Sequence, residues 1–534
     1  MNSVLSLALA AGMIFCMVFA AGCNAPGPSG APPSPVTTQP PGASAGLMNG
    51  APAYSDAELN QIITDFDAYA EKARQDWGVP GMAIAIVKGD KVLLAKGYGV
   101  KTAGTSDPVT PETVFQIAST SKAFTSAMVA MEVDRGALKW DDKVTTYLPD
   151  FQMKDPWVTR EFTITDTMAH RSGLPGYWGD ELMSLGYNDS YAIHALRYAE
   201  PVSSFRSDYA YQNVVYSVPT VIVEKTTGKS WEENLQERIF TPLGMTGSSA
   251  DYESFRTAKD VASPHLYKVT SDGSMVSEPI PADSPMRSMT YLQPGAGGIN
   301  SNAHDMANWL RFQMGNGTFD GQRLISEENL NYVHSPRTPL SPDMEDTTFY
   351  CQGWLWQETK YGPMIWHSGA VGGYHNFVAY SPREKVGIVI LTNNVQSNLA
   401  DAMYYQFFSM YFGNTGADLS GEILKAKKAE NTGTVPAEPV LPAGAHPSLP
   451  LSAYTGTYTN TPFGTAIVSE QKGNLTVTMG PAQQKLLLVQ GNENIFLVSD
   501  SSVKMRVTFG VDKDNTVKSI TIPLGRVTPV FTRV

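Results

Sequence analysis

Charge is scarce in this sequence. Charged residues make up only 17% of the 534 residues, and 39 Lys and Arg stand against 51 Asp and Glu, which gives a net charge of -12. Binding to a phosphate backbone needs a clustered basic face, and Lys and Arg form no long run here. The composition therefore argues against a nucleic-acid partner. A hydrophobic share of 42% is typical of a globular protein, and the length predicts more than one domain.

Cysteine is almost absent as well. Two of the three cysteines, Cys16 and Cys23, lie near the N-terminus, which leaves Cys351 alone in the rest of the chain. A lone cysteine makes no internal disulfide, and we interpret Cys351 as a buried residue rather than a catalytic thiol. The eight histidines form no His-Glu-x-x-His pattern, so the sequence predicts no metal site and no cofactor.

The first 23 residues have the pattern of an export signal. Residues 4–22 carry no charge and end in small residues before Cys23, as a secretory signal does. The ending Ala20-Ala21-Gly22-Cys23 resembles a bacterial lipobox, which implies that Cys23 is lipidated. The usual positive charges before the apolar segment are missing, so a plain signal peptide and an anchor helix remain alternatives. We expect an exported, periplasmic or cell-surface protein that is anchored to a membrane by a lipid.

Apolar patterns divide the body of the chain. They recur at helical spacing over residues 59–70, and the apolar runs 82–87 and 92–95 flank a polar turn, as in a β-hairpin. Residues 113–310 are mainly helical in pattern, strands return over 350–394, and an aromatic-rich helix follows at 399–412. This order predicts an α/β (α+β) fold in which an antiparallel sheet is flanked by helices and carries an all-helical subdomain.

The hydrophobic pattern changes in the last part of the chain. Short alternating apolar segments separated by turn residues predict a separate all-β domain, a small barrel or sandwich. The segment 24–53 is rich in Pro, Gly, Ala and Ser, a composition that predicts a tether without a packed core. The predicted organisation is a signal peptide at 1–23, a linker at 24–53, a catalytic domain at 54–413, a second linker at 414–450 and the β-domain at 451–534.

Three Ser-x-x-Lys motifs are present, at Ser119-Lys122, Ser469-Lys472 and Ser501-Lys504. Only the first precedes a helical pattern; the other two fall in the predicted β-domain, where alternate residues point to opposite faces. Residues i and i+3 share one face of a helix, so the Lys122 amine can reach the Ser119 hydroxyl. A hydroxyl needs such a base to become a nucleophile, and the amine serves only if its pKa is lowered. We therefore predict Ser119 as the nucleophile and Lys122 as its base.

Tyr-x-Asn also occurs three times, at Tyr211-Asn213, Tyr374-Asn376 and Tyr458-Asn460. A tyrosine can act as a second proton carrier, and an asparagine amide can hold a substrate carbonyl. The first of these motifs lies between the predicted nucleophile and the motif described next, and we favour it. Tyr374 is its rival.

His367-Ser368-Gly369 occurs once, after an apolar run that predicts a strand. A small residue followed by glycine lets a substrate approach the backbone closely. The next amide, at Ala370, can then face an oxyanion.

Taken together in this order, the three motifs resemble the pattern of class C β-lactamases and of related penicillin-binding proteins and esterases (peptidase S12-like). The flanking segments resemble that superfamily too. They are Phe115-Gln116-Ile117-Ala118, the loop His170-Arg171-Ser172-Gly173-Leu174-Pro175, Pro242-Leu243-Gly244-Met245, and Gly295-Ala296-Gly297-Gly298-Ile299 with Asp305-Met306. The resemblance spans about residues 55–412. We interpret His170 as structural rather than catalytic.

The resemblance implies roles for the site residues. Ser119 attacks a carbonyl, Lys122 and Tyr211 carry the proton, and Asn213 contacts the acyl side chain. The amides of Ser119 and Ala370, next to Ser368 and Gly369, form the oxyanion hole. The last domain resembles the lipocalin-like domain of some members, including D-amino-acid peptidases.

We predict His367 as the fourth catalytic residue, and a strand residue with a purely structural role is the alternative. It departs from the class C pattern, which has lysine there. Lysine supplies a fixed positive charge for a substrate carboxylate, whereas histidine is charged only below about pH 6.5. The sequence thus predicts a serine hydrolase of esters, amides or D-amino-acid peptides in preference to β-lactams. Its partners are a small-molecule or peptide substrate, peptidoglycan and the membrane. The alternative is a sensor or peptidoglycan-binding module that is acylated but never turns over.

Overall fold

The computed structural model describes residues 54–269, 275–340, 347–431, 445–499 and 505–534. The predicted signal, Cys16, Cys23, the first linker and Ser501-Lys504 lie outside the described residues. The chain forms two compact units, which we describe separately. The described part of the larger one comprises residues 54–179, 189–269, 275–340 and 347–431, and we call it the sheet unit. The described part of the other, the barrel unit, comprises residues 180–188 and 445–534.

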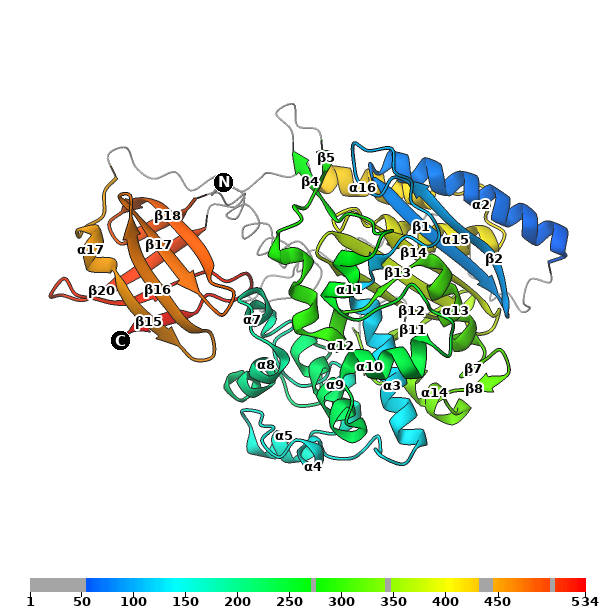
Figure 1. Cartoon of the computed structure of the whole chain (residues 1–534), viewed down its shortest axis with the longest axis horizontal. Helices are drawn as coiled ribbons and strands as arrows, with labels where there is room; N and C mark the ends of the chain where they lie inside the picture. The colour runs from blue at the N-terminus through cyan, green and yellow to red at the C-terminus, as the bar shows by residue number, and fades with distance from the viewer. Residues whose placement is uncertain (1–53, 270–274, 341–346, 432–444, 500–504) are drawn as a thin grey trace. The chain divides into compact units, whose positions relative to one another are not determined.

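An antiparallel sheet of eight strands lies at the centre of the sheet unit, in the order β2-β1-β14-β13-β12-β11-β10-β9 (Figure 1). Ile84 pairs with Ile390 in the register of β1 and β14, and both strands are buried because helices cover the two faces. This explains why their sequences are continuously apolar rather than alternating. The strands are β1 (Gly81–Lys88), β2 (Lys91–Gly99), β9 (Thr338–Pro339), β10 (Thr348–Tyr350), β11 (Leu355–Thr359), β12 (Gly362–Val371), β13 (Tyr374–Ser381) and β14 (Val386–Thr392).

One face of the sheet is covered by the first and last helices of the unit, α2 (Asp56–Asp76) and α15 (Leu399–Tyr411). A capping box between Ser55 and Glu58 starts α2, which satisfies backbone N–H groups that a helix start otherwise leaves open. The rings of Phe66 and Phe407 pack edge to face at 5.1 Å and join the two helices. The chain ends of the unit thereby close its core.

A third helix, α16 (Leu419–Asn431), lies within the segment 414–450 that the sequence analysis assigned to a linker. The Trp77 indole N–H donates to the Ser420 hydroxyl at 2.9 Å, and Ile423 and Leu424 pack against the core. The local pattern offers only these few apolar positions between lysines. The helix is therefore stabilised by its packing against α2 and α15 rather than by propensity alone.

The other face carries α13 (Ala303–Met314), which packs on β1 and β14. Beyond it lies the helical region, in which α3 (Lys122–Asp134), α9 (Asn213–Thr227) and the short α12 (Pro294–Gly297) contact one another. The predicted class is confirmed: a helix-flanked antiparallel sheet with a helical subdomain.

The barrel unit contains a closed eight-stranded antiparallel barrel, β15 to β22, which confirms the separate β-domain. Its interior is filled by apolar side chains such as Val477 and Phe509. Residues 180–188, far away in sequence, belong to this unit: the Ala482 N–H donates to the Leu185 carbonyl at 3.1 Å. The strands are β15 (Gly456–Asn460), β16 (Gly464–Gln471), β17 (Asn474–Met479), β18 (Gln484–Asn492), β19 (Ile495–Val498), β20 (Arg506–Val511), β21 (Val517–Thr521) and β22 (Val530–Arg533).

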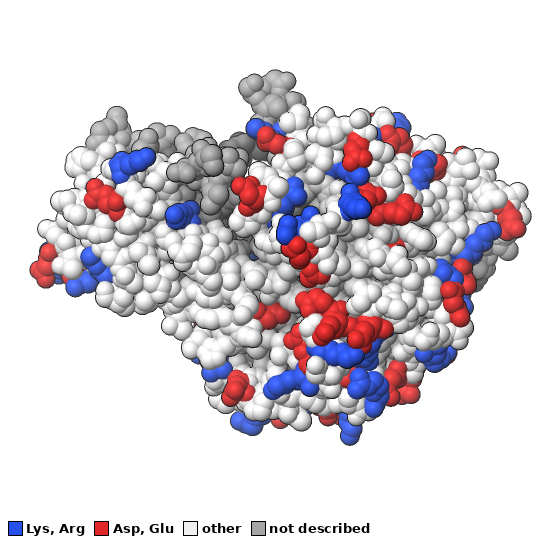
Figure 2. Space-filling model, viewed as in Figure 1, with Lys and Arg blue, Asp and Glu red and all other residues white. Residues whose placement is uncertain are grey.

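On the face drawn in Figure 2, the Lys and Arg side chains of the described residues lie interspersed with Asp and Glu side chains. Among the helices of the described ranges, none combines the length and the apolar composition needed to cross a membrane.

Candidate active site

Ser119 lies in a short 3-10 turn, Ala118–Ser121, which leads directly into α3. Ala118 has a φ of +52°, a left-handed conformation that is uncommon for a residue other than glycine. The Thr120 hydroxyl closes the turn by donating to the Ile117 carbonyl at 2.8 Å. Ser119 is half-buried, while its neighbours Ala118 and Thr120 are buried. The turn therefore leaves the Ser119 hydroxyl accessible.

Lys122 is fully buried, and its amine touches the nucleophile. Its Nζ lies 3.4 Å from the Ser119 Oγ, 2.7 Å from the Asn213 Oδ1 and 2.7 Å from the Ala296 carbonyl oxygen. The Asn213 and Ala296 oxygens only accept, so two N–H bonds of the amine point at them. Once it has lost a proton, an amine in this position can accept the proton of the Ser119 hydroxyl.

Tyr211 joins this cluster from the segment before α9. The Lys122 Nζ lies 4.8 Å from the centre of the Tyr211 ring. Burial raises the pKa of Tyr211 well above 10, and the nearby Ser119 hydroxyl opposes that shift only in part. The Tyr211 hydroxyl meets the distance and angle criteria of a hydrogen bond with none of the described residues, and the Ser119 hydroxyl is the hydrogen-bonding side chain that affects its pKa.

The rival Tyr-x-Asn motifs lie elsewhere. The Tyr374 hydroxyl donates to the Ala262 carbonyl at 2.6 Å, and Asn376 lies inside the sheet on β13. Tyr458 is in the barrel, where its hydroxyl donates to the Tyr454 carbonyl at 2.7 Å. Of the three motif tyrosines, Tyr211 is the one beside Lys122.

Strand β12 brings His367, Ser368, Gly369 and Ala370 to the nucleophile. A Cβ placed on Gly369 would lie 2.4 Å from the Ile117 carbonyl oxygen and 3.0 Å from the Ser119 nitrogen. Only glycine permits this approach of two backbones. The contact brings the Ser119 amide next to the strand that carries Ala370, which the proposed oxyanion hole requires.

The surroundings of His367 lower its pKa below the ordinary value near 6.5, so the site offers a substrate carboxylate still less positive charge than the sequence predicts. Burial, and then the positive charge of Lys122, lower the pKa of His367 to about 3. Its Nδ1 lies 2.6 Å from the Ser368 carbonyl oxygen, and its Nε2 lies 3.1 Å from the Tyr350 hydroxyl. Because a carbonyl only accepts, the proton is on Nδ1, and Nε2 accepts from Tyr350. His367 is thus a neutral residue of fixed tautomer.

Sequence reasoning missed Tyr350 and Ala296 as parts of the site. Tyr350 stands in no recognisable motif, and its ring centre lies 4.2 Å from that of His170. Ala296 belongs to one of the flanking segments noted above, but the use of its carbonyl by Lys122 depends on how α12 packs against α3.

No cluster of three or more His, Cys, Asp or Glu side chains suited to a metal ion exists in the part of the chain that the structure describes. Cys351 is buried, its Sγ donates to the His334 carbonyl at 3.1 Å, and burial raises the pKa of its thiol. A thiol in this state is a poor nucleophile.

Comparisons with known proteins identify relatives of both parts of the chain. Residues 441–532 match the model of a domain of unknown function, DUF3471. An unguisins hydrolase of Aspergillus campestris is 27% identical over 422 residues, which cover 74% of this chain and 75% of the relative. Penicillin-binding protein 4 of Amycolatopsis lactamdurans is 30% identical over 60% of this chain and 82% of its own length. The octameric penicillin-binding protein homologue from Pyrococcus abyssi superposes with a TM-score of 0.58 at 22% identity, covering 88% of this chain and all of that one. Residues 66–406 match the Beta-lactamase family model, and the chain belongs to that family.

Proposed function

We propose that this protein is an exported serine hydrolase that cleaves ester or amide bonds through an acyl-enzyme. The observation that carries the proposal is the buried amine of Lys122, held by Asn213 and Ala296 within 3.4 Å of the Ser119 hydroxyl. A lysine that only stabilises the fold does not need to be buried beside a serine hydroxyl. A serine that acts as a nucleophile, by contrast, needs a base within reach. Two relatives that are named hydrolases support the same proposed function.

The reaction runs in two halves. The Ser119 Oγ attacks the carbonyl carbon while its proton passes to Lys122 and Tyr211, and the oxyanion accepts hydrogen bonds from the amides of Ser119 and Ala370. The leaving group takes that proton as its bond to the carbonyl carbon breaks, which leaves an ester on Ser119. Water then attacks the carbonyl carbon of this ester, and Tyr211 accepts the water's proton as it passes its own on toward Lys122 and Ser119. The bond between the carbonyl carbon and the Ser119 Oγ breaks, Ser119 regains its proton, and the acid product leaves. Asn213 contacts the acyl side chain in addition to holding Lys122.

The substrate is an ester, an amide or a D-amino-acid peptide rather than a β-lactam. A penicillin carries a carboxylate, and the neutral His367 offers it no positive charge. A peptide fragment of peptidoglycan fits the same chemistry. The predicted lipid on Cys23 would hold the enzyme at the membrane, with residues 24–53 as a tether.

The test is intact-mass spectrometry of the chain from residue 54 onward after incubation with a fluorophosphonate, wild type beside Ser119→Ala. We expect one adduct on the wild type and none on the variant. An adduct on both proteins, or on neither, would overturn Ser119 as the nucleophile.

The second candidate is a sensor that is acylated and not released, and the penicillin-binding names of relatives favour it. Mass spectra over time after a penicillin pulse separate the two functions. Loss of the adduct with recovery of the free mass supports the hydrolase, and a permanent adduct without turnover of any ester supports the sensor.

A further inference from the structure

The Tyr211 hydroxyl is buried and, within the described residues, meets the distance and angle criteria of a hydrogen bond with no partner, although its interaction with the Ser119 hydroxyl opposes the rise in its pKa. A contact with the nucleophile alone does not fix where the Tyr211 ring lies. A proton carrier that is misplaced by about 1 Å can lose about 10²-fold in rate. The contacts around the rest of the side chain point to His170.

His170 holds the chain on both sides of Tyr211. The Ala210 N–H donates to the His170 carbonyl at 2.8 Å, and the Gln212 N–H donates to the His170 Nδ1 at 3.1 Å. The ring centres of His170 and Tyr211 are 4.2 Å apart. Tyr211 thus lies against the imidazole while its two neighbours in sequence are bonded to the same residue.

The imidazole is suited to this task and not to proton transfer. Burial lowers the pKa of His170 well below 6.5, and a positive charge on the nearby Lys122 adds to that shift. Because Nδ1 accepts from Gln212, the neutral ring carries its proton on Nε2. This Nε2 is buried and meets no hydrogen-bond acceptor among the described residues. The ring nitrogen of His170 that makes a hydrogen bond is therefore Nδ1, which accepts from the backbone next to Tyr211.

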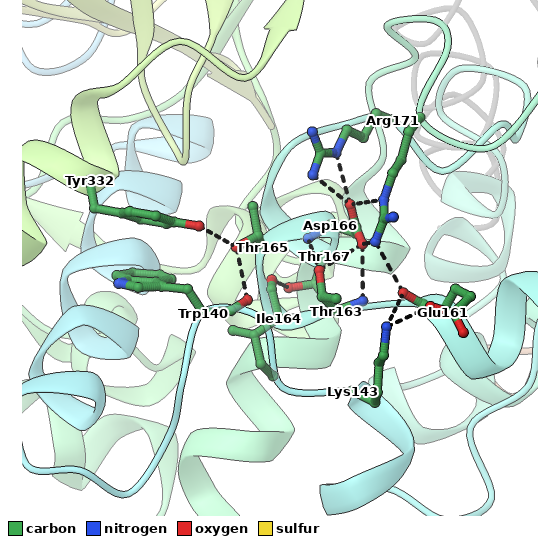
Figure 3. A network of polar contacts seen from close by, with 11 residues as sticks. Trp140, Lys143, Glu161, Thr163, Ile164, Thr165, Asp166, Thr167, Arg171 and Tyr332 are labelled. Carbon is green, nitrogen blue, oxygen red and sulfur yellow. Dashed lines mark hydrogen bonds and ion pairs between the residues drawn. The ribbon is translucent and has the colours of Figure 1, made fainter.

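The surrounding frame keeps His170 in an unusual conformation. Its φ is +52°, in the left-handed region that asparagine tolerates better than most residues. The next residue, Arg171, forms an ion pair of 2.8 Å with the buried carboxylate of Asp166, as Figure 3 shows. Asp166 also binds Arg206 at 2.6 Å, and the Arg206 N–H donates to the Arg171 carbonyl at 2.8 Å. Asp166 thus fastens together the two loops that contain His170 and lead to Tyr211.

We infer that His170 is a positioning residue for Tyr211: through its Nδ1, its carbonyl and its ring it sets where the Tyr211 hydroxyl stands relative to Ser119 and Lys122. The inference rests on the proposed function, because it gives Tyr211 a reason to be placed accurately. It also gives a reason for the left-handed backbone conformation of His170. Such a conformation is energetically unfavourable and persists where the surrounding structure requires it.

Two substitutions separate the contributions of His170. His170→Asn keeps an acceptor near the Nδ1 position and tolerates the left-handed φ, whereas His170→Phe keeps an aromatic ring and loses the acceptor. We expect kcat for a neutral ester, and the rate of fluorophosphonate acylation, to fall about 100-fold in His170→Phe. His170→Asn should recover most of that loss, and KM should change less than threefold in both variants. His265→Phe, which removes a buried histidine outside the site, is the matched control: it should lower the melting temperature without lowering the acylation rate of the folded protein.

A double-mutant cycle shows whether His170 acts through Tyr211. In a Tyr211→Phe background, His170→Phe should cost less than threefold further in acylation rate, because the residue that it positions is already inactive. Additive losses, or equal losses in His170→Asn and His170→Phe, would overturn the inference. If the wild type itself forms no adduct, the proposed function fails. If the wild type and His170→Phe react at the same rate, only the inference about His170 fails.

Discussion

The Tyr350 hydroxyl donates to the Nε2 of His367 across 3.1 Å, and the Nδ1 of the same ring donates to the Ser368 carbonyl at 2.6 Å. Both nitrogens are therefore occupied, and the ring is neutral. At the strand position where class C β-lactamases have lysine, this site presents a hydrogen-bonded, uncharged group.

A lysine at this position should change substrate preference. In His367→Lys, we expect the acylation rate with benzylpenicillin to rise about tenfold relative to that with a neutral ester, because a charge near the carboxylate contributes about 1.4 kcal/mol. Stopped-flow acylation with both reagents measures the ratio, and His367→Gln serves as the uncharged control. An unchanged ratio in His367→Lys would show that carboxylate recognition does not depend on this residue.

Tyr211→Phe should lower the acylation rate by a factor of about 10²–10⁴, which is the contribution of a positioned proton carrier. Tyr374→Phe is the matched control from the rival motif. It loses the hydrogen bond to the Ala262 carbonyl, so it should lower the free energy of unfolding by about 1 kcal/mol and leave acylation unchanged. A slow Tyr374→Phe beside a normal Tyr211→Phe would reverse the assignment of the motif.

Gly369→Ala should damage the site directly. The new Cβ would lie 2.4 Å from the Ile117 carbonyl oxygen, so β12 must move away from the Ser119 turn. We expect kcat to fall by about 10²–10³, the usual cost of losing one oxyanion donor. Gly416→Ala meets no atom within 4 Å and should behave as wild type in the same ester assay. Normal kcat in Gly369→Ala would argue against the proposed oxyanion hole.

Asp166→Asn should destabilise the fold. Burial raises the pKa of Asp166, but Arg206, Thr163 and Arg171 together outweigh burial and hold it below its ordinary value. A carboxyl whose folded pKa is depressed stabilises the fold above its unfolded pKa, near 3.9, and this contribution is lost as the pH falls through the folded pKa. Breaking such a buried pair costs about 3–5 kcal/mol at pH 7. Urea unfolding at pH 7 tests this value, and a loss below about 1 kcal/mol would mean that the pair is not important for stability.

Four histidines of the described residues have a lowered pKa and predict a loss of stability in mild acid. Burial lowers the pKa of His265 to about 4 and those of His334 and His367 to about 3, and it lowers the pKa of His170 well below 6.5. Below pH 6.5 the unfolded chain binds protons that the folded chain does not, so each histidine should cost about 1.4 kcal/mol per pH unit between pH 6 and 5. Urea unfolding at these two pH values measures the slope. His265→Gln should have the smaller slope, and an equal slope would contradict the burial argument for that residue.

The sequence by itself determined the broad outline of this protein. Apolar runs such as 82–87 and 386–391 have no other place than a covered sheet, and short alternating segments beyond residue 450 specified the barrel. The spacing of Ser119 and Lys122 also determined that they share one face, because it is set by local backbone geometry.

Only the tertiary structure decided what local geometry leaves open. It placed Tyr211, and not Tyr374, beside Lys122. The two Tyr-x-Asn motifs are alike in sequence and differ in their neighbours in the fold. It placed His367 in surroundings that lower its pKa, since that pKa depends on burial and on Lys122, and it brought Tyr350 from another strand to fix the tautomer. It placed α16 in a segment with too few apolar residues to form a helix on its own. In each case the deciding partner lies far away in sequence, where periodicity and spacing carry no information.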